Sequence, residues 1–192
     1  MNKKIQIPFD KEELKDLRAG DYVYLSGTVY SARDAAHKRM YEAVVAADSE
    51  EAKRAALPFD IRNQAIYYLG PTPAPEGHVI GSAGPTTASR MDKYTPMLLD
   101  MGLTGMIGKG KRSPEVREAV VRNGCVYFAA TGGAGALLSK CIVSSEVIAY
   151  DDLGTEAIRK MEVRDFPAVV VIDSAGNNLY ETAVKDYLAS RK

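Results

Sequence analysis

Metal-binding side chains, net charge and long apolar runs are all scarce in this 192-residue sequence. It has two cysteines and two histidines, and its 25 Lys and Arg residues balance 25 Asp and Glu residues. A four-iron cluster or a structural zinc site needs more ligands than two separated cysteines provide, so we expect no metal bound by this chain alone. A general nucleic-acid binder needs a cationic excess, and the zero net charge argues against that class.

No apolar run approaches the roughly 20 residues needed to cross a bilayer, and residues 1–5 lack the apolar core of a signal peptide. Cys125 and Cys141 lie beside apolar runs, which predicts buried free thiols in a reducing compartment. We therefore expect a cytoplasmic protein with no membrane partner. The length suits one well-buried core, so residues 1–192 are predicted to form a single domain.

Strand-like and helix-like segments follow each other along the chain. Ser31 resembles an N-cap with Asp34 three residues later, and Gly27 suggests a bulge in the strand before it. Ser113-Pro114 starts a helix that Asn123-Gly124 ends. The predicted strands cover 4–7, 22–29, 64–68, 78–81, 104–107, 125–130, 142–150 and 168–172. The predicted helices cover 11–17, 31–47, 85–101, 113–123, 135–140 and the C-terminal residues. This order favours an α/β fold with a largely parallel central sheet in its second half.

The segment from Gly84 to Pro96 combines hydroxyls, a cation and a carboxylate at a predicted helix start. Thr86, Thr87 and Arg90 place donors where a helix favours anions, which suits a small carboxylate or phosphate. The alternatives are that the threonines only cap the helix, and that Arg90 is a surface arginine or forms a structural ion pair with Asp92 or Asp100.

Two further stretches carry cations. Lys109 lies between two glycines after an apolar strand, so its backbone can approach a ligand closely; the alternative is a solvated basic loop that continues through Lys111 and Arg112. Arg33 and His37 share one face of a predicted helix. Glycine-rich residues 131–135 resemble a phosphate-cradling loop, although the dinucleotide spacing is absent and a plain structural turn explains them equally well.

Five segments in the same order resemble the beta subunit of class I iron–sulfur fumarate hydratases and of the related L-tartrate dehydratases. These segments are 31–37, 84–96, 107–110, 131–136 and 166–173. The resemblance implies a swivelling β/β/α domain. It also implies that Arg33, Arg90 and Lys109 bind substrate and that Thr86 contacts substrate and takes part in proton transfer. His37, Thr87 and Asp92 are weaker candidates.

The resemblance further implies a function. The chain is expected to be the beta subunit of a two-subunit fumarate hydratase, which adds water to fumarate reversibly to give malate. A larger alpha subunit is expected to carry a [4Fe-4S] cluster, with the small dicarboxylate bound between the subunits of a hetero-oligomer. One alternative is the beta subunit of L-tartrate dehydratase. An alternative of another class is a non-catalytic module that binds a small anion for regulation.

Overall fold

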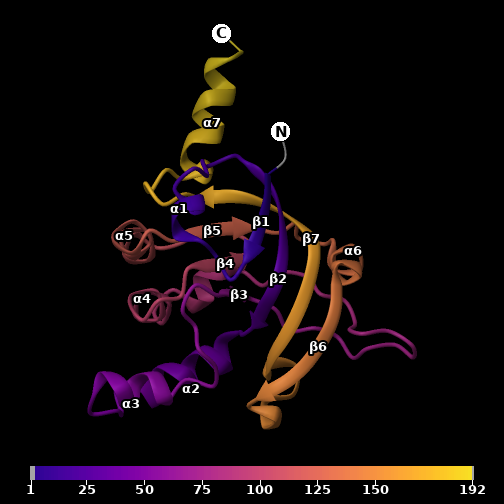
Figure 1. The fold of residues 1–192 in the computed structure, drawn as a ribbon. Helices are drawn as coiled ribbons and strands as arrows, with labels where there is room; N and C mark the ends of the chain where they lie inside the picture. Colours follow the sequence, from indigo (N-terminus) through magenta and orange to yellow (C-terminus); the bar gives the residue numbers. More distant parts are fainter. Residues whose placement is uncertain (1–2, 192) are drawn as a thin grey trace.

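A single mixed sheet organises residues 3–191, the part of the chain that this computed structural model describes (Figure 1). Its strand order is β1-β2-β3-β4-β5-β7-β6, and β2 also pairs with β7. Strands β2, β3, β4, β5 and β7 therefore close into a small five-stranded barrel. The strands are β1 (Lys3–Ile7), β2 (Tyr22–Ser31), β3 (Ala65–Tyr67), β4 (Gly105–Gly108), β5 (Val126–Ala129), β6 (Ile142–Ala149) and β7 (Ile158–Ile172).

The predicted α/β class is confirmed, but the second half of the chain is not largely parallel: β4 and β5 are parallel, whereas β6 and β7 pair antiparallel, so the sheet is mixed. Strands β1 to β5 are parallel to their neighbours, whereas β7 is antiparallel to β2, β5 and β6. Only the last third of β7, 168–172, was predicted from sequence. In its first half, buried Ile158, Met161 and Val163 are separated by charged residues on the outer face. This part of the strand therefore contains no continuous apolar run that would predict it.

Helices and loops differ from the prediction at several places, and helix α3 (Glu50–Ala55) was not predicted. The helix predicted from Ser31 begins at Asp34, with Arg33 as its N-cap, because β2 continues to Ser31 and the Ser31 hydroxyl accepts a hydrogen bond from the Arg159 N–H. The strand predicted at 78–81 is a loop. The helix predicted over 85–101 is two short helices, because Pro96 cannot donate to a preceding turn and so begins a helix instead of continuing one.

Other local predictions are confirmed. The pairing of β2 with β7 shifts register between Leu25 and Gly27, and Gly27 has a positive φ of 114°. The predicted bulge is therefore present. The Ser113 hydroxyl accepts a hydrogen bond from the Val116 N–H, and Gly124 ends that helix in the left-handed region. The helices are α1 (Lys11–Leu14), α2 (Asp34–Val45), α3 (Glu50–Ala55), α4 (Thr95–Asp100), α5 (Pro114–Asn123), α6 (Gly135–Leu138) and α7 (Leu179–Ala189), with 3-10 turns η1 (Ala88–Met91), η2 (Ser139–Cys141) and η3 (Asp151–Glu156).

Two apolar clusters cover opposite faces of the sheet. Tyr67 and Ile107 belong to the cluster that includes β1, α1 and β7, and their neighbours Tyr68 and Met106 belong to the cluster under α2, α4 and α5. This alternation is the period of a strand buried on both faces. Figure 1 shows α2, α4 and α5 along one side of the sheet, with α7 projecting away from the body. Across residues 3–191, no helix has the length and apolar character to span a membrane.

The two cysteines differ in burial. Cys125 is buried, and burial raises the pKa of its thiol to about 12. Cys141 is only half-buried, so the prediction of two buried thiols is wrong for that residue.

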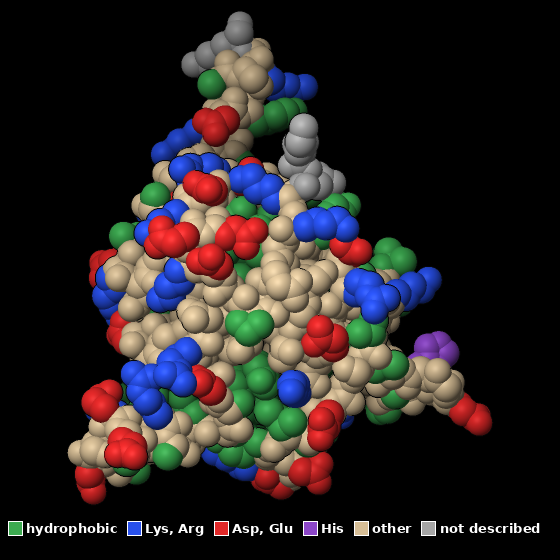
Figure 2. Space-filling model, viewed as in Figure 1, with side chains coloured by type: hydrophobic (Ala, Val, Ile, Leu, Met, Phe, Trp, Pro, Cys, Tyr) green, Lys and Arg blue, Asp and Glu red, His purple; other side chains and the backbone are tan. Residues whose placement is uncertain are grey.

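Figure 2 shows basic and acidic side chains interspersed over the visible face, with no extended area of one charge sign. This distribution agrees with the balanced composition.

Candidate active site

Four chain segments meet at one edge of the sheet. Because β2, β3, β4 and β5 are parallel, their carboxyl ends lie together. Arg33 follows β2, Gly70 follows β3, Lys109 follows β4 and Gly132 follows β5. The carboxyl edge of parallel strands is where α/β proteins usually bind ligands.

Backbone hydrogen bonds attach the Thr86–Arg90 segment to this edge. The Thr86 N–H donates to the Tyr68 carbonyl at 2.7 Å, and the Lys109 N–H donates to the Thr86 carbonyl at 3.2 Å. The Lys109 carbonyl in turn accepts from the Ala88 N–H at 2.8 Å, so Thr87 and Lys109 pair as a short parallel bridge. The sheet therefore brings together the two motifs that were predicted separately.

Glycines allow this close packing. A Cβ atom on Gly108 would lie 2.8 Å from Cδ2 of Tyr68, and one on Gly70 would lie 2.7 Å from Nη1 of Arg33. In the glycine-rich loop, Gly135 packs against the backbone of Gly84, which a Cβ would approach to 2.9 Å, and Gly132 lies beside the Lys109 side chain. The loop thus has a packing role at the site.

An acid pair holds the two predicted substrate arginines. The Asp34 Oδ2 contacts a terminal nitrogen of Arg90 and lies 3.8 Å from Nη2 of Arg33. The Glu156 Oε1 lies 3.2 Å from the same Arg33 nitrogen, and its Oε2 accepts a hydrogen bond from the Ala35 N–H at 2.8 Å. The alternative partner for Arg90, Asp92, is not the one that it uses. The arginines are brought together through Asp34.

Lys109, Thr86 and Thr87 keep free functional groups. Within residues 3–191, no carboxylate lies within 4.0 Å of the Lys109 ammonium, and neither threonine hydroxyl makes a hydrogen bond. Thr87 is the N-cap of η1 but its side chain forms no capping bond, so the capping interpretation fails for this residue. Since η1 is a single turn, anion attraction here depends on the cationic side chains.

His37 is completely buried behind Arg33. Its Nδ1–H donates to the Arg33 carbonyl at 2.9 Å, and its Nε2 has no hydrogen-bond partner among the described residues. The ring meets Tyr68 edge-on, with ring centroids 5.4 Å apart. Burial lowers the pKa of His37 to about 4, and the Arg112 charge adds to that effect. A neutral His37 therefore supports the Arg33 backbone from inside.

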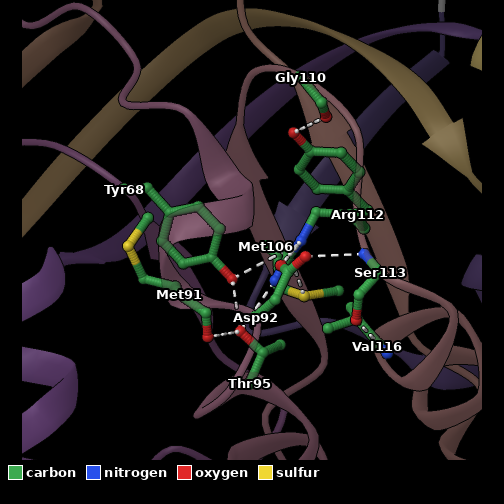
Figure 3. A network of polar contacts seen from close by, with 10 residues as sticks. Tyr68, Met91, Asp92, Thr95, Met106, Gly110, Arg112, Ser113 and Val116 are labelled. Atoms are coloured by element: carbon green, nitrogen blue, oxygen red, sulfur yellow. Dashed lines mark hydrogen bonds and ion pairs between the residues drawn. The ribbon is translucent and has the colours of Figure 1, made fainter.

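Asp92, two residues after Arg90, belongs to a buried network of polar contacts (Figure 3). Its Oδ1 accepts a hydrogen bond from Arg112 Nε at 2.6 Å, and its Oδ2 accepts from the Ser113 N–H at 2.7 Å. The Arg112 side chain is 0% exposed and also donates to the Tyr68 and Thr95 hydroxyls at 3.1 and 2.8 Å. Arg112 is thus not part of a solvated basic loop.

Comparison with known proteins identifies the family. The family model described as fumarase C-terminus matches residues 1–183. The chain belongs to the fumarase C-terminus family. It is 40% identical over 177 residues to fumarate hydratase 2 of Leishmania major, and 42% identical over 159 residues to the aerobic class I fumarate hydratase of Escherichia coli strain K12. These matches cover 90% and 82% of this chain, but the chain spans only 30% and 28% of those relatives.

A third relative has nearly the same extent. The protein named putative L(+)-tartrate dehydratase subunit beta from Methanocaldococcus jannaschii is 35% identical over 181 residues, which cover 91% of this chain and 89% of that protein. The predicted resemblance to the fumarase C-terminus family is therefore confirmed. The roles assigned to individual residues stay predictions.

An iron–sulfur cluster does not fit the residues of this fumarase C-terminus chain. Among residues 3–191, no group of three or more His, Cys, Asp or Glu side chains is placed to hold a metal ion. The two thiols are separate, one of them buried under the sheet.

Sequence reasoning missed three residues of the site. Asp34 was interpreted only as a capping residue, although its position directly after Arg33 was a usable signal. Glu156 carried no signal, because it lies far along the chain in an ordinary acidic stretch. Arg112 resembled its solvated neighbour Lys111, and only the placement of Asp92 and Tyr68 shows that it is internal.

Proposed function

We propose that the chain is the beta subunit, or the equivalent part, of an iron–sulfur fumarate hydratase that converts fumarate and malate reversibly. The observation that carries this proposal is the meeting of Arg33, Arg90 and Lys109 at one sheet edge beside the free Thr86 hydroxyl. Family membership supports a hydro-lyase, since the relatives include fumarate hydratases. The near-complete match to a protein named subunit beta supports a partner alpha subunit.

The cations suit a dicarboxylate. Arg90 is half exposed and offers N–H donors to one carboxylate, while the unpaired Lys109 ammonium neutralises the second carboxylate or charge that develops on the substrate. Arg33 is held in place from behind by Glu156 and His37. The three cations bind and orient the substrate, and the electrostatic field that they create favours its carboxylate form.

Thr86 is the proposed contact to the reacting carbon. A free hydroxyl is a poor base, and Lys109, held beside Thr86 by backbone hydrogen bonds, supplies the positive charge that an alkoxide needs. The [4Fe-4S] cluster is expected in the cytoplasmic alpha subunit, where it would supply the Lewis acid for the substrate hydroxyl. The swivelling β/β/α description of this domain is part of the same proposal.

Reconstitution tests the proposal. The chain purified alone is expected to bind no iron and to have no hydratase activity, whereas the assembly with a cluster-bearing alpha subunit is expected to hydrate fumarate. Fumarate consumption is followed by the loss of its ultraviolet absorbance. A stoichiometric cluster in the chain alone, or an assembled and iron-loaded complex without hydratase activity, would contradict the proposal.

L-Tartrate is the second candidate substrate. The match over 89% of a protein named putative L(+)-tartrate dehydratase subunit beta favours it. The same cations would bind tartrate, because it also has two carboxylates. The ratio of kcat/KM for L-tartrate to that for malate, measured on one preparation of the assembly, decides between the two.

A further inference from the structure

Asp34 lies between the two arginines proposed to bind substrate carboxylates. It is the first residue of α2, directly after the strand end that carries Arg33, so the fold fixes its position. One oxygen, Oδ2, contacts Arg90 and lies 3.8 Å from Nη2 of Arg33. Two neighbouring guanidinium groups repel each other, and a carboxylate oxygen shared between them offsets that repulsion.

The contact between Asp34 and Arg90 uses only part of each group. On the aspartate, Oδ1 is buried and has no hydrogen-bond partner among residues 3–191. On the arginine, one terminal nitrogen is engaged, whereas a guanidinium carries five N–H donors. The side chain of Arg90 is 51% exposed, so its remaining donors are open to a carboxylate from solution.

Another ion pair of α2 has a different geometry and gives the contrast. Arg39 donates from both terminal nitrogens to the two carboxylate oxygens of Asp152, at 2.8 and 2.7 Å. That bidentate pair engages both terminal nitrogens of the guanidinium group. Asp34 differs from Asp152, because it engages one terminal nitrogen of its arginine and leaves the other one available.

We infer that Asp34 is a positioning residue. It binds one terminal nitrogen of Arg90, keeps the guanidinium group near Arg33, and leaves the other N–H donors of Arg90 free to bind a substrate carboxylate. The inference rests on the proposed function. Asp34 acts through the arginines and does not itself touch the substrate. Glu156 restrains Arg33 from the other side, so both cations are ordered before the substrate arrives.

Kinetics of the assembled enzyme test the inference first. Asp34→Asn keeps the shape of the side chain and removes its charge, so kcat/KM is expected to fall about 10-fold, mainly through a higher KM, with an unchanged melting temperature. Asp34→Glu restores the charge and is expected to recover part of the loss. Asp152→Asn, which breaks the Arg39 pair of the same helix, is expected to leave the kinetics unchanged. Wild-type kinetics for Asp34→Asn, or a kinetic loss matched by a fall in melting temperature, would overturn the inference.

A second readout is independent of turnover. In the full-length chain, nitrogen NMR of the Arg90 guanidinium group is expected to show slow rotation about the Nε–Cζ bond in the wild type and in Asp152→Asn, and fast rotation in Asp34→Asn. Fast rotation already in the wild type would overturn the inference. If Asp34 controls the rotation while the assembled complex fails to hydrate fumarate, the positioning of Arg90 stands and the proposed function fails.

Discussion

Two ion pairs involve neighbouring residues of the same short segment of chain, Arg90 and Asp92, and they differ most in their exposure to water. Arg112 and Asp92 have side chains that are 0% and 12% exposed, whereas Arg90 and Asp34 are 51% and 29% exposed. Arg112 is surrounded by protein acceptors and by two aromatic rings, with its guanidinium carbon 5.2 Å from the ring centroid of Tyr68. Arg90 has one acceptor and open donors.

This difference in exposure suggests different roles for the two pairs. A buried charge has no water to replace a lost partner, so the Arg112 pair is expected to control stability. An exposed pair exchanges with water at little cost, so the Asp34–Arg90 pair is expected to control ligand geometry instead. The residues of η1 connect the two, and the scaffold thereby holds the site in register.

Arg112→Met is expected to have the largest effect, and it tests whether the buried pair stabilises the fold. This change leaves the buried Asp92 carboxylate without its cation, so the free energy of unfolding is expected to fall by roughly 3–5 kcal/mol. Arg122→Met is the control, because the Arg122–Asp100 pair is about half exposed and its loss is expected to cost roughly 0–1 kcal/mol. Urea unfolding measures both variants. Equal stability loss in the two variants would contradict the scaffold role of Arg112.

Lys109→Met tests the cation that forms no ion pair with the described residues 3–191. Because no carboxylate of the described residues pairs with Lys109, the fold is expected to keep its stability. Loss of a preorganised charge at the reacting centre is expected to lower kcat of the assembled enzyme by about 100-fold or more. Lys111→Met, in the exposed neighbouring position, is the control and is expected to behave like the wild type. Normal turnover by Lys109→Met would make Lys109 an ordinary loop lysine.

Arg90→Lys tests the geometry of the exposed arginine. Lysine keeps the charge but loses the planar fork, so one charge-assisted hydrogen bond, of about 1.5–3 kcal/mol, is expected to be lost. kcat/KM is then expected to fall by roughly one to two orders of magnitude with an unchanged melting temperature. Arg39→Lys on α2 serves as the control. Unchanged kinetics would remove Arg90 from the site, and a large fall in melting temperature would make its role structural.

Sequence alone predicted the motifs of the site but not the direction in which each side chain points. Lys109 and the Thr86–Arg90 segment were both identified, yet only the parallel bridge between Thr87 and Lys109 shows that they meet. Arg90 and Arg112 both lie in polar stretches, and nothing local tells that one faces solvent and the other the interior. That choice depends on Asp92 and on neighbours distant in sequence.

The fold shows the same limit. Local signals found most helix ends and strand cores, since Ser113, Gly124 and Gly27 each act through their own backbone geometry. The barrel closure was not predicted, because it requires β7 to pair with both β2 and β5, and long-range pairing leaves no mark on a short window of sequence.

The smallest expected effect comes from His37, which donates a hydrogen bond to the Arg33 carbonyl and whose pKa is lowered mainly by burial and further by the Arg112 charge. Its pKa is about 4 in the fold against 6.5 ordinarily, so between these values the unfolded chain binds a proton that the folded chain does not. Stability is therefore expected to fall as pH decreases from 7, by about 2 kcal/mol at pH 5. His37→Gln is expected to remove this dependence, whereas His78→Gln, at an exposed position, is expected to keep it. Urea unfolding at pH 7 and pH 5 compares the variants, and an equal pH dependence in His37→Gln and the wild type would show that His37 does not stay neutral in the fold.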